Sequence, residues 1–258
     1  MATQADLLTR SARFVRRFLG KSETEGCAPE QMLNPLEEPF RSVLLSMYRN
    51  QAQEGLDRGL HPLDPSLRIP PSQGMWLYEN CRTRRSRSVL EIGTCYGYSA
   101  LFILAAISKN EVGRLTSIDP SERTVWHGIA LRSIEKVGAG QCFRHIEDRS
   151  DRAAIDLARE GAAFDLIFID GNHRFDDVLT DFYLFAQLCV KGGQVVFDDM
   201  WMPSIRAVVS FVRANRADFR EVPNAERNIA VFEKVGEDAR EWDHFRPFSI
   251  VRQSGGNS

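Results

Sequence analysis

Short apolar runs alternate with amphipathic stretches along the chain from about residue 88 to residue 234. Runs this short, rich in Val, Ile, Leu and Phe, are typical of buried strands, whereas the longer stretches between them have helical spacing. The pattern predicts strands at 88–92, 115–118, 142–146, 164–169 and 194–197. It predicts helices at 99–107, 123–137, 151–160, 176–189 and 204–215, and a final hairpin from 219–222 and 229–234.

This order of elements predicts an α/β fold with a Rossmann-like, doubly wound sheet. The sheet should be mostly parallel, with an antiparallel hairpin at its C-terminal end. Right-handed crossovers place every loop that follows a parallel strand at one edge of the sheet. Ligands of open α/β sheets bind along that edge, so we expect the functional residues there.

The first part of the chain predicts an N-terminal helical extension, with a boundary near residue 68. Residues 1–20 have apolar positions at helical spacing with arginines between them, and a further helix is expected at 39–53. The Gly- and Pro-rich stretch 55–72 predicts a loop, followed by a helix from residue 72. The arm 1–68 either packs on the body or on a second subunit of a homodimer, forms a lid, or lies on a membrane surface. The predicted division is 1–68, a domain at 69–236 and a tail at 237–258.

Composition excludes several classes of protein. The 258 residues are 43% hydrophobic and 26% charged, with a net charge of -2, so the chain lacks the basic field expected for nucleic-acid or anionic-membrane binding. No apolar stretch reaches the ~18 residues of a transmembrane helix. Five cysteines without a CxxC pair favour the reducing cytoplasm over a disulfide framework or a zinc site.

The first candidate site follows the strand at 88–92. Gly93 and Gly97 frame a turn into a helix, where backbone N–H groups are free to bind a carboxylate. The GxxxG spacing differs from the GxGxxG fingerprint of nicotinamide dehydrogenases, and no P-loop lysine follows. The turn therefore predicts a cofactor site of another kind.

Two further loops at the same edge carry polar residues suited to a nucleoside. Asp119 ends the second strand, where an acidic side chain can accept hydrogen bonds from both ribose hydroxyls. The polar loop 147–150 follows the third strand, where it is placed to contact an adenine edge.

The fourth and fifth strands deliver carboxylates and an imidazole. Asp170 and His173 follow the strand at 164–169, and Asp198 and Asp199 follow the strand at 194–197. Three converging carboxylates repel one another unless a cation lies between them, and Mg²⁺ prefers oxygen ligands. A histidine beside such a site is a candidate general base, although each of these residues also occurs as an ordinary helix cap or solvated side chain.

The segments that carry these residues resemble the class I S-adenosylmethionine-dependent methyltransferases. They are PPSQG (70–74), VLEIGTCYGYS (89–99), SIDP (117–120), FDLIFIDGNH (164–173) and KGGQVVFDD (191–199). More narrowly, the chain is similar to the O-methyltransferases of catechol type and to those that act on sugars.

The resemblance implies a role for each matching residue. The methionine part of S-adenosylmethionine would contact Glu91, Gly93, Thr94, Tyr96, Gly97 and Ser99, with Asp170 beside it; Asp119 would hold the ribose; Arg149 and Ser150 would contact adenine; and the metal ligands would be Asp170, Asp198 and Asp199. His173 stands where the catechol-type enzymes carry a catalytic lysine, so it would serve as the base together with Asp170.

The sequence therefore predicts S-adenosylmethionine-dependent O-methylation of a hydroxyl on a small molecule, assisted by Mg²⁺ or another divalent cation. Two alternatives stay open: a metal-independent methyltransferase acting on nitrogen or another nucleophile, and a non-catalytic cofactor-binding module. Apolar residues that follow or precede these motifs are candidates for the acceptor pocket: Met75, Trp76, Phe175, Trp201 and Met202.

Overall fold

The structure is a computed structural model that describes residues 28–250. The predicted helix at 1–20 and the end of the predicted tail lie outside the described residues. The strands are β1 (Gln53–Glu54), β2 (Leu60–His61), β3 (Ser88–Ile92), β4 (Arg114–Ile118), β5 (Phe143–Ile146), β6 (Phe164–Ile169), β7 (Cys189–Phe197), β8 (Phe219–Val222) and β9 (Ala230–Lys234). The helices are α2 (Pro29–Met32), α3 (Phe40–Tyr48), α4 (Pro71–Arg84), α5 (Tyr98–Asn110), α6 (Ile129–Lys136), α7 (Ser150–Arg159), α8 (Phe175–Phe185) and α9 (Pro203–Asn215), with single 3-10 turns at η1 (Pro65–Leu67) and η2 (Gly140–Cys142).

The centre of the molecule is a seven-stranded sheet in the order β5-β4-β3-β6-β7-β9-β8. The strands from β5 to β7 are parallel, and β9 and β8 complete the sheet as an antiparallel pair. The predicted α/β class and the C-terminal antiparallel hairpin are confirmed. The order reverses between β3 and β6, which is the switch point where open α/β sheets bind ligands.

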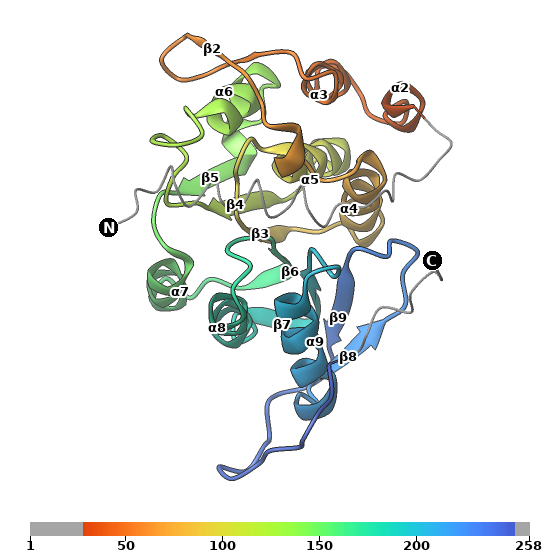
Figure 1. The fold of residues 1–258 in the computed structure, drawn as a ribbon, viewed down its shortest axis with the longest axis vertical. Coiled ribbons are helices and arrows are strands. Elements are labelled where there is room, and N and C mark those ends of the chain that lie inside the picture. Colours follow the sequence, from red (N-terminus) through yellow and green to blue (C-terminus); the bar gives the residue numbers. More distant parts are fainter. Residues whose placement is uncertain (1–27, 251–258) are drawn as a thin grey trace.

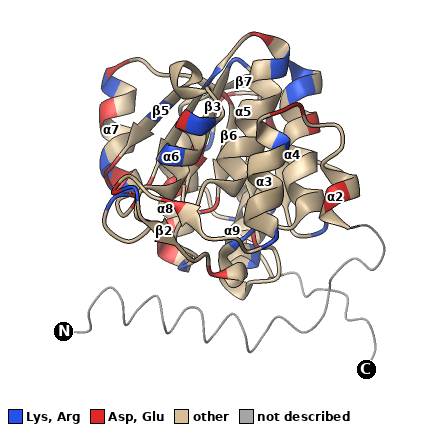
Figure 2. Cartoon of the chain, turned by 90° about the horizontal axis from the view of Figure 1, so that it is seen from above, with Lys and Arg blue, Asp and Glu red and all other residues tan. Residues whose placement is uncertain are grey.

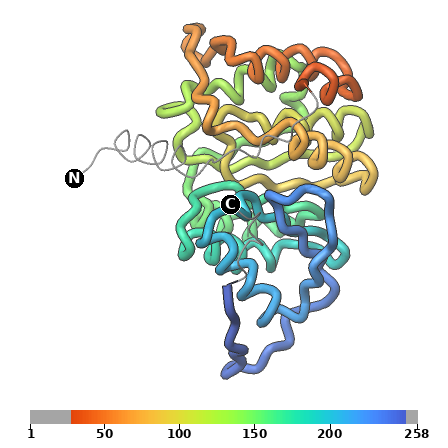
Figure 3. Tube along the Cα trace, turned by 45° about the vertical axis from the view of Figure 1, so that its right-hand side comes forward, coloured from red at the N-terminus to blue at the C-terminus, as the bar shows by residue number. Residues whose placement is uncertain are grey.

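Alternation along the strands gives the sheet two apolar faces, each covered by helices (Figure 1). Leu166 and Phe168 of β6 face the cluster that contains α4, α5 and α6, whereas Ile167 and Ile169 face the cluster that contains α7, α8 and α9. This period of two is the reason that β6 reads as a continuous apolar run in the sequence. Figure 3 shows the early part of the chain on one side of the molecule and the late part on the other, as the strand order requires.

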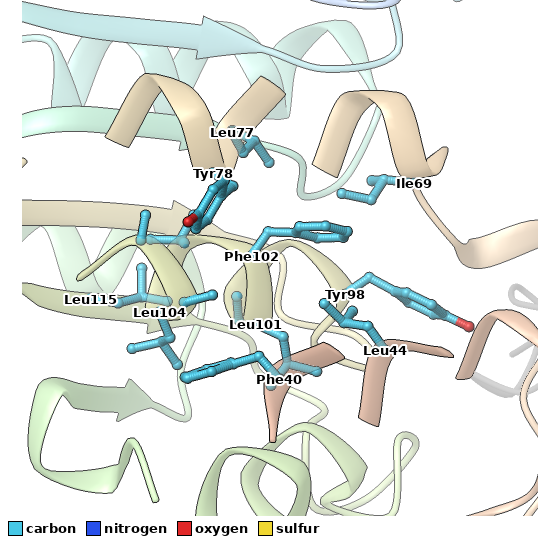
Figure 4. Close-up of a cluster of buried hydrophobic side chains, with 14 of the residues drawn as sticks. Phe40, Leu44, Ile69, Leu77, Tyr78, Tyr98, Leu101, Phe102, Leu104 and Leu115 are labelled. Carbon is cyan, nitrogen blue, oxygen red and sulfur yellow. The ribbon is translucent and has the colours of Figure 1, made fainter. Parts of the chain in front are cut away.

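The segment before α4 belongs to the same hydrophobic core as the sheet. α3 packs on α5, and Phe40 and Leu44 meet Leu101 and Phe102 (Figure 4). The polar end of a buried tyrosine also finds a backbone partner there, because the Tyr98 hydroxyl donates to Met47 O at 3.1 Å. Residues 29–69 thus extend the layer on this face of the sheet, and the predicted domain boundary at residue 68 stays a prediction.

Some elements differ from the sequence pattern for local reasons. The helix predicted at 39–53 ends at Tyr48, so β1 forms just before the predicted loop 55–72, and β2 lies within that loop. The helix predicted from residue 123 begins at Ile129, because the chain first turns through Gly128, whose φ is +67°. The helix predicted at 176–189 ends at Phe185, and β7 begins at Cys189, five residues before the predicted strand 194–197.

We expect Phe102→Ala to lower the free energy of unfolding by about 3–5 kcal/mol. Phe102 is fully buried between α4 and α3, and its ring lies 2.1 Å from the position that a Cβ on Gly74 would occupy, so the helices cannot close over the cavity without moving. Denaturant unfolding measures the change. The matched control is Phe245→Ala, since Phe245 is 64% exposed and its loss should cost about 0.5 kcal/mol or less.

Candidate active site

The turn after β3 is fixed by contacts within the chain itself. Gly93 has a φ of +95°, and a Cβ there would lie 2.0 Å from the carbonyl oxygen of Asp170. Gly97 has a φ of +84° at the start of α5, and a Cβ there would meet Ala130 Cβ at 2.7 Å. Both positions therefore require glycine for packing, in addition to the ligand access that the sequence suggested.

Asp119 closes this turn from the neighbouring strand. Its Oδ2 accepts hydrogen bonds from the backbone N–H groups of Thr94 (3.2 Å) and Cys95 (3.0 Å), and its Oδ1 accepts one from Ser121 N (2.8 Å). Cys95 has a left-handed φ of +48°, which aims its N–H at the carboxylate. Asp119 thus holds the predicted cofactor loop in shape while standing at the predicted ribose position.

Glu91 lies at the centre of a buried polar group beneath the turn. Its side chain is fully buried, and its Oε2 accepts a hydrogen bond of 2.5 Å from Ser117 Oγ, which in turn lies 2.6 Å from Thr94 Oγ1. Burial raises the pKa of Glu91 to about 8, against the smaller opposing effect of the Ser117 hydroxyl. Its Oε1 is buried without a hydrogen-bond partner among the described residues. A buried acceptor of this kind is suited to a ligand donor.

The remaining predicted residues of the cofactor motif surround the turn. Tyr96 is nearly buried, its ring packs edge-on against Trp126, and its hydroxyl accepts from Asp64 N at 3.4 Å. Ser99 is 4% exposed in the first turn of α5, and its hydroxyl, like that of Ser117, opposes the rise in the pKa of Glu91.

Asp170, His173 and Asp199 form a second polar cluster, adjoining the turn. His173 Nε2 lies 2.9 Å from Asp199 Oδ2 and 3.5 Å from Asp170 Oδ1, and one ligand atom from each residue lies within 4.8 Å of the others. Both distances fit ion pairs, but the angles at the atoms do not fit hydrogen bonds. Within residues 28–250, His173 Nε2 is therefore a buried polar atom without a hydrogen-bond partner. Asp199 is held in a left-handed conformation with φ +55°, a strained backbone of the kind found at functional sites.

Asp198 points away from that cluster into a network of amides. Its Oδ2 accepts from Gln73 Nε2 at 2.6 Å, and its Oδ1 accepts from Asn228 Nδ2 at 2.9 Å and from Asp199 N at 2.5 Å. Asp198 is 2% exposed, whereas the side chains of Asp170 and Asp199 are 20% and 24% exposed. The structure therefore groups two of the three predicted metal ligands with His173 and places the third behind them.

The electrostatics follow from burial and from the single imidazole. Burial raises the pKa of Asp170 and of Asp198, and neighbouring carboxylates add to both effects. Burial would lower the pKa of His173, but its contacts with Asp170 and Asp199 outweigh burial and raise it. Burial likewise opposes ionisation of Asp199, yet His173 draws the pKa of this carboxyl below its usual value. The two carboxylates thus favour the protonated form of His173.

The predicted adenine contacts lie farther along the edge, at the start of α7. Arg149 is largely exposed and its guanidinium pairs with Asp151 at 3.0 Å. Ser150 hydrogen-bonds the buried Asp181, whose pKa burial raises to about 6. Both residues stand at the sheet edge as expected, but their own contacts are with α7 and α8.

Sequence reasoning missed the residues that position the acidic groups. Gln73 had a usable signal, because an amide in the first turn of a helix otherwise facing the core needs a polar partner. Ser117 lies inside a strand run and Asn228 lies in the loop before β9, so neither has a local signal. Trp201, predicted only as a pocket residue, donates from Nε1 to Asp199 Oδ1 at 2.8 Å.

The sequence segment that carries this site matches a known protein family. Residues 90–200, which contain the turn, Asp119 and both acidic loops, match the family model described as "Methyltransferase domain". This stretch of the chain is therefore similar to a methyltransferase domain. The resemblance read from the motifs is thereby confirmed.

Relatives of this methyltransferase domain include O-methyltransferases. A catechol O-methyltransferase from Niastella koreensis is 30% identical over 52% of this chain and 58% of its own length. A flavonoid 3',5'-methyltransferase from Vitis vinifera is 21% identical over 58% of this chain and 65% of its own length. The chain thus spans somewhat less than two thirds of the curated relatives that it matches.

Solved structures share the fold of the domain. The O-methyltransferase TomG from Streptomyces achromogenes, in complex with SAM, aligns with a TM-score of 0.58 at 24% identity, over 78% of this chain and 91% of that one. An O-methyltransferase from Bacillus cereus in complex with SAH aligns with a TM-score of 0.58 at 18% identity, over 87% and 97%.

Within residues 28–250, none of the helices combines the length and the apolar character needed to span a bilayer.

We expect Glu91→Gln to change how stability depends on pH. The folded pKa of about 8 lies above the ordinary value of 4.5, so the folded protein binds the proton more tightly than the unfolded chain does. This contribution is complete below about pH 4.5 and is lost as the pH rises through 8, at ~1.4 kcal/mol per pH unit at most. Between pH 5 and pH 9, the free energy of unfolding should fall less in the variant than in the wild type. The exposed Glu241→Gln should follow the wild type at both pH values.

Proposed function

We propose that this protein is an S-adenosylmethionine-dependent O-methyltransferase that acts on a hydroxyl of a small molecule and uses a divalent cation. One observation carries the proposal: the cofactor turn and the acidic cluster adjoin. The backbone of Gly93 packs directly against the carbonyl of Asp170, and Asp170 N donates to Ile92 O at 3.0 Å. A methyl donor in the turn and an acceptor at the cluster would therefore lie side by side, as direct transfer requires.

The turn offers complementary partners for the cofactor. The N-terminus of α5 supplies free N–H groups for a carboxylate, and Glu91 Oε1 is a buried acceptor for an ammonium group. Asp119 Oδ1 accepts a hydrogen bond from Ser121 N at 2.8 Å, and a carboxylate oxygen keeps a further lone pair that can accept from a ribose hydroxyl. These contacts support the predicted roles of Glu91, the glycine turn and Asp119.

The donor set of the second cluster fits a divalent cation. Asp170 and Asp199 would hold it through carboxylate oxygens, and the unpartnered Nε2 of His173 lies between them. Mg²⁺ would use the oxygens, whereas a transition metal would also accept the imidazole. Asp198 would act behind this pair, because its hydrogen bonds with Gln73 and Asn228 fix the start of the loop that carries Asp199.

The chain's own groups then have distinct tasks. A bound cation would supply positive charge that favours the deprotonated form of an acceptor hydroxyl. Trp201 orients Asp199 through its indole N–H, and Ser204 fixes the backbone of His173 by donating to its carbonyl at 2.6 Å. His173, once both carboxylates engage another partner, is the base within reach of the acceptor proton.

A small molecule with a hydroxyl is the acceptor that these features favour. Lys and Arg are interspersed with Asp and Glu over the face in Figure 2, without the broad basic field that a nucleic acid requires. The half-exposed Phe175 and the indole of Trp201 adjoin the cluster and suit an aromatic ring. The names of two relatives, catechol and flavonoid methyltransferases, agree with a phenolic acceptor.

We place this activity in the reducing cytoplasm, which the free thiols of Cys81, Cys95, Cys142 and Cys189 support. A homodimer built through the N-terminal arm is also proposed. Light scattering of the full chain and of a chain lacking residues 1–35 tests it, and a monomer in both cases contradicts it.

Asp119→Ala should weaken binding of S-adenosylhomocysteine by about 10- to 100-fold, because it removes hydrogen bonds of a charged acceptor to the ligand and to the turn. Calorimetric titration measures the loss. Asp156→Ala, at an exposed carboxylate of α7 that pairs with Arg159, is the matched control and should bind as the wild type does. Tight wild-type binding to a nicotinamide dinucleotide instead of S-adenosylhomocysteine would contradict the proposed cofactor.

Chelation should abolish turnover of a phenolic acceptor, and added Mg²⁺ should restore it. Asp170→Asn and Asp199→Asn should each lower the rate by at least about 100-fold, and His173→Ala should lower it by about 100- to 10,000-fold. The affinity of Asp199→Asn for S-adenosylhomocysteine should change little. Steady-state rates with labelled S-adenosylmethionine measure these effects.

Full activity in chelator would favour the second candidate, a metal-independent methyltransferase. One observation supports that candidate: His173 lies within ion-pair distance of both Asp170 and Asp199 and offsets part of their negative charge without an ion. Chelator-resistant turnover that His173→Ala removes would establish it in place of the metal-assisted reaction.

A further inference from the structure

A second group of metal-ligating side chains lies away from the acidic cluster. Asp57 and His61 belong to the β1–β2 hairpin, and His127 belongs to the turn that precedes α6. One ligand atom from each residue lies within 4.8 Å of the others. We propose that these three side chains form a transition-metal site, best suited to Zn²⁺, that joins the hairpin to the turn. This site is independent of the proposed function.

The geometry brings two imidazoles and a carboxylate to one point. The rings of His61 and His127 stack with centroids 3.9 Å apart and an interplanar angle of 5°. His61 Nε2 lies 2.9 Å from Asp57 Oδ1 and 3.0 Å from Asp57 Oδ2. The His127 ring stacks on His61 but has no hydrogen-bond partner within residues 28–250, so its nitrogens are available to a ligand.

The backbone holds these residues together without a metal. Leu56 N donates to His127 O at 2.9 Å, and a Cβ on Gly55 would lie 2.6 Å from that same oxygen. On the other side of the contact, a Cβ on Gly128 would lie 2.4 Å from Leu56 Cγ. His127 itself adopts a left-handed conformation with φ +56°. The two segments are thus fitted closely. Because an imidazole binds a metal in the plane of its ring, one of the two stacked rings would turn about its side-chain bonds to reach a shared ion, while the backbone stays in place.

The donor set selects the class of metal. Two imidazole nitrogens and one carboxylate oxygen are typical ligands of Zn²⁺, which takes four ligands at ~2.0–2.2 Å, whereas Mg²⁺ and Ca²⁺ prefer oxygen. Three protein ligands leave the remaining position to water. The nearby cationic side chains of Arg58, Arg132 and Lys136 pair with Glu54, and Arg132 also pairs with Glu135, so none of these ion pairs occupies Asp57.

The site would brace the wall of the proposed cofactor pocket. The turn that carries His127 begins directly after Asp119 and Ser121, and Trp126 packs edge-on against Tyr96. Gly128 N donates to Glu122 O at 2.8 Å, and the fully buried Glu122 side chain caps the start of α6 by accepting from Ala130 N. A metal that joins His61 to His127 would therefore stiffen the segment between Asp119 and α6.

Zn²⁺ binding to the tag-free full chain tests the proposal. Because the acidic cluster also offers metal ligands, the measurement uses the Asp170→Asn/Asp199→Asn double variant as background. Competition with a chromogenic chelator gives the affinity and the stoichiometry of Zn²⁺ binding. We expect this background to bind one equivalent. Adding His61→Ala or His127→Ala should weaken that binding at least about tenfold, since each removes a direct ligand. His244→Ala, outside the site, is the matched control and should change nothing.

A second readout separates metal binding from a structural role. Zn²⁺ should raise the melting temperature of the background variant and leave that of the His61→Ala/His127→Ala form unchanged. Co²⁺ should give the visible absorption of a site with nitrogen ligands only when both histidines are present. Equal Zn²⁺ affinity with and without His61 and His127, or no binding by the background variant, overturns the proposal. Activity of the enzyme does not enter either readout, so failure of the proposed function leaves this result separate.

Discussion

The close approach of β3 and β6 at their carboxyl ends is the constraint on which the rest of the site depends. Gly93 lets the backbone reach the carbonyl of Asp170, and any side chain there would push the two strands apart. Since β3 carries the cofactor turn and β6 carries the acidic cluster, this one contact brings the two halves of the proposed reaction together. The strand order reverses at the same place, which opens the edge for a ligand.

The site accepts unfavourable electrostatics around that contact. Burial raises the pKa values of Glu91, Asp170 and Asp198 in one small region, and the fully buried Glu122, whose pKa burial raises to about 9, lies next to it. Groups of this kind reduce stability unless they are paired, and several retain an unpartnered oxygen or nitrogen. Such an arrangement is characteristic of sites that bind charged ligands, because the ligand supplies the missing partners.

A second layer of residues fixes the reactive ones. Gln73 of α4 and Asn228 of the loop before β9 come from opposite ends of the chain, and both donate to Asp198. The β1–β2 hairpin likewise contacts the turn before α6, because Leu56 N donates a hydrogen bond to His127 O. The segment before α4 thus contributes to the frame of the site through α3, the hairpin and α4, in addition to its packing on α5.

The sequence by itself determined the class of fold, the strands of the sheet and the edge at which the motifs lie, because period-two apolar runs and glycine turns are local signals. It also predicted Asp170, His173, Asp198 and Asp199 as site residues, since all four lie in the loops that follow two buried strands. Only the tertiary structure decided that Asp198 turns toward Gln73 and Asn228 while His173 lies between Asp170 and Asp199. Two adjacent carboxylates look alike in a sequence, and which one faces the ligand depends on hydrogen-bond donors that lie 125 residues before Asp198, in Gln73, and 30 residues after it, in Asn228.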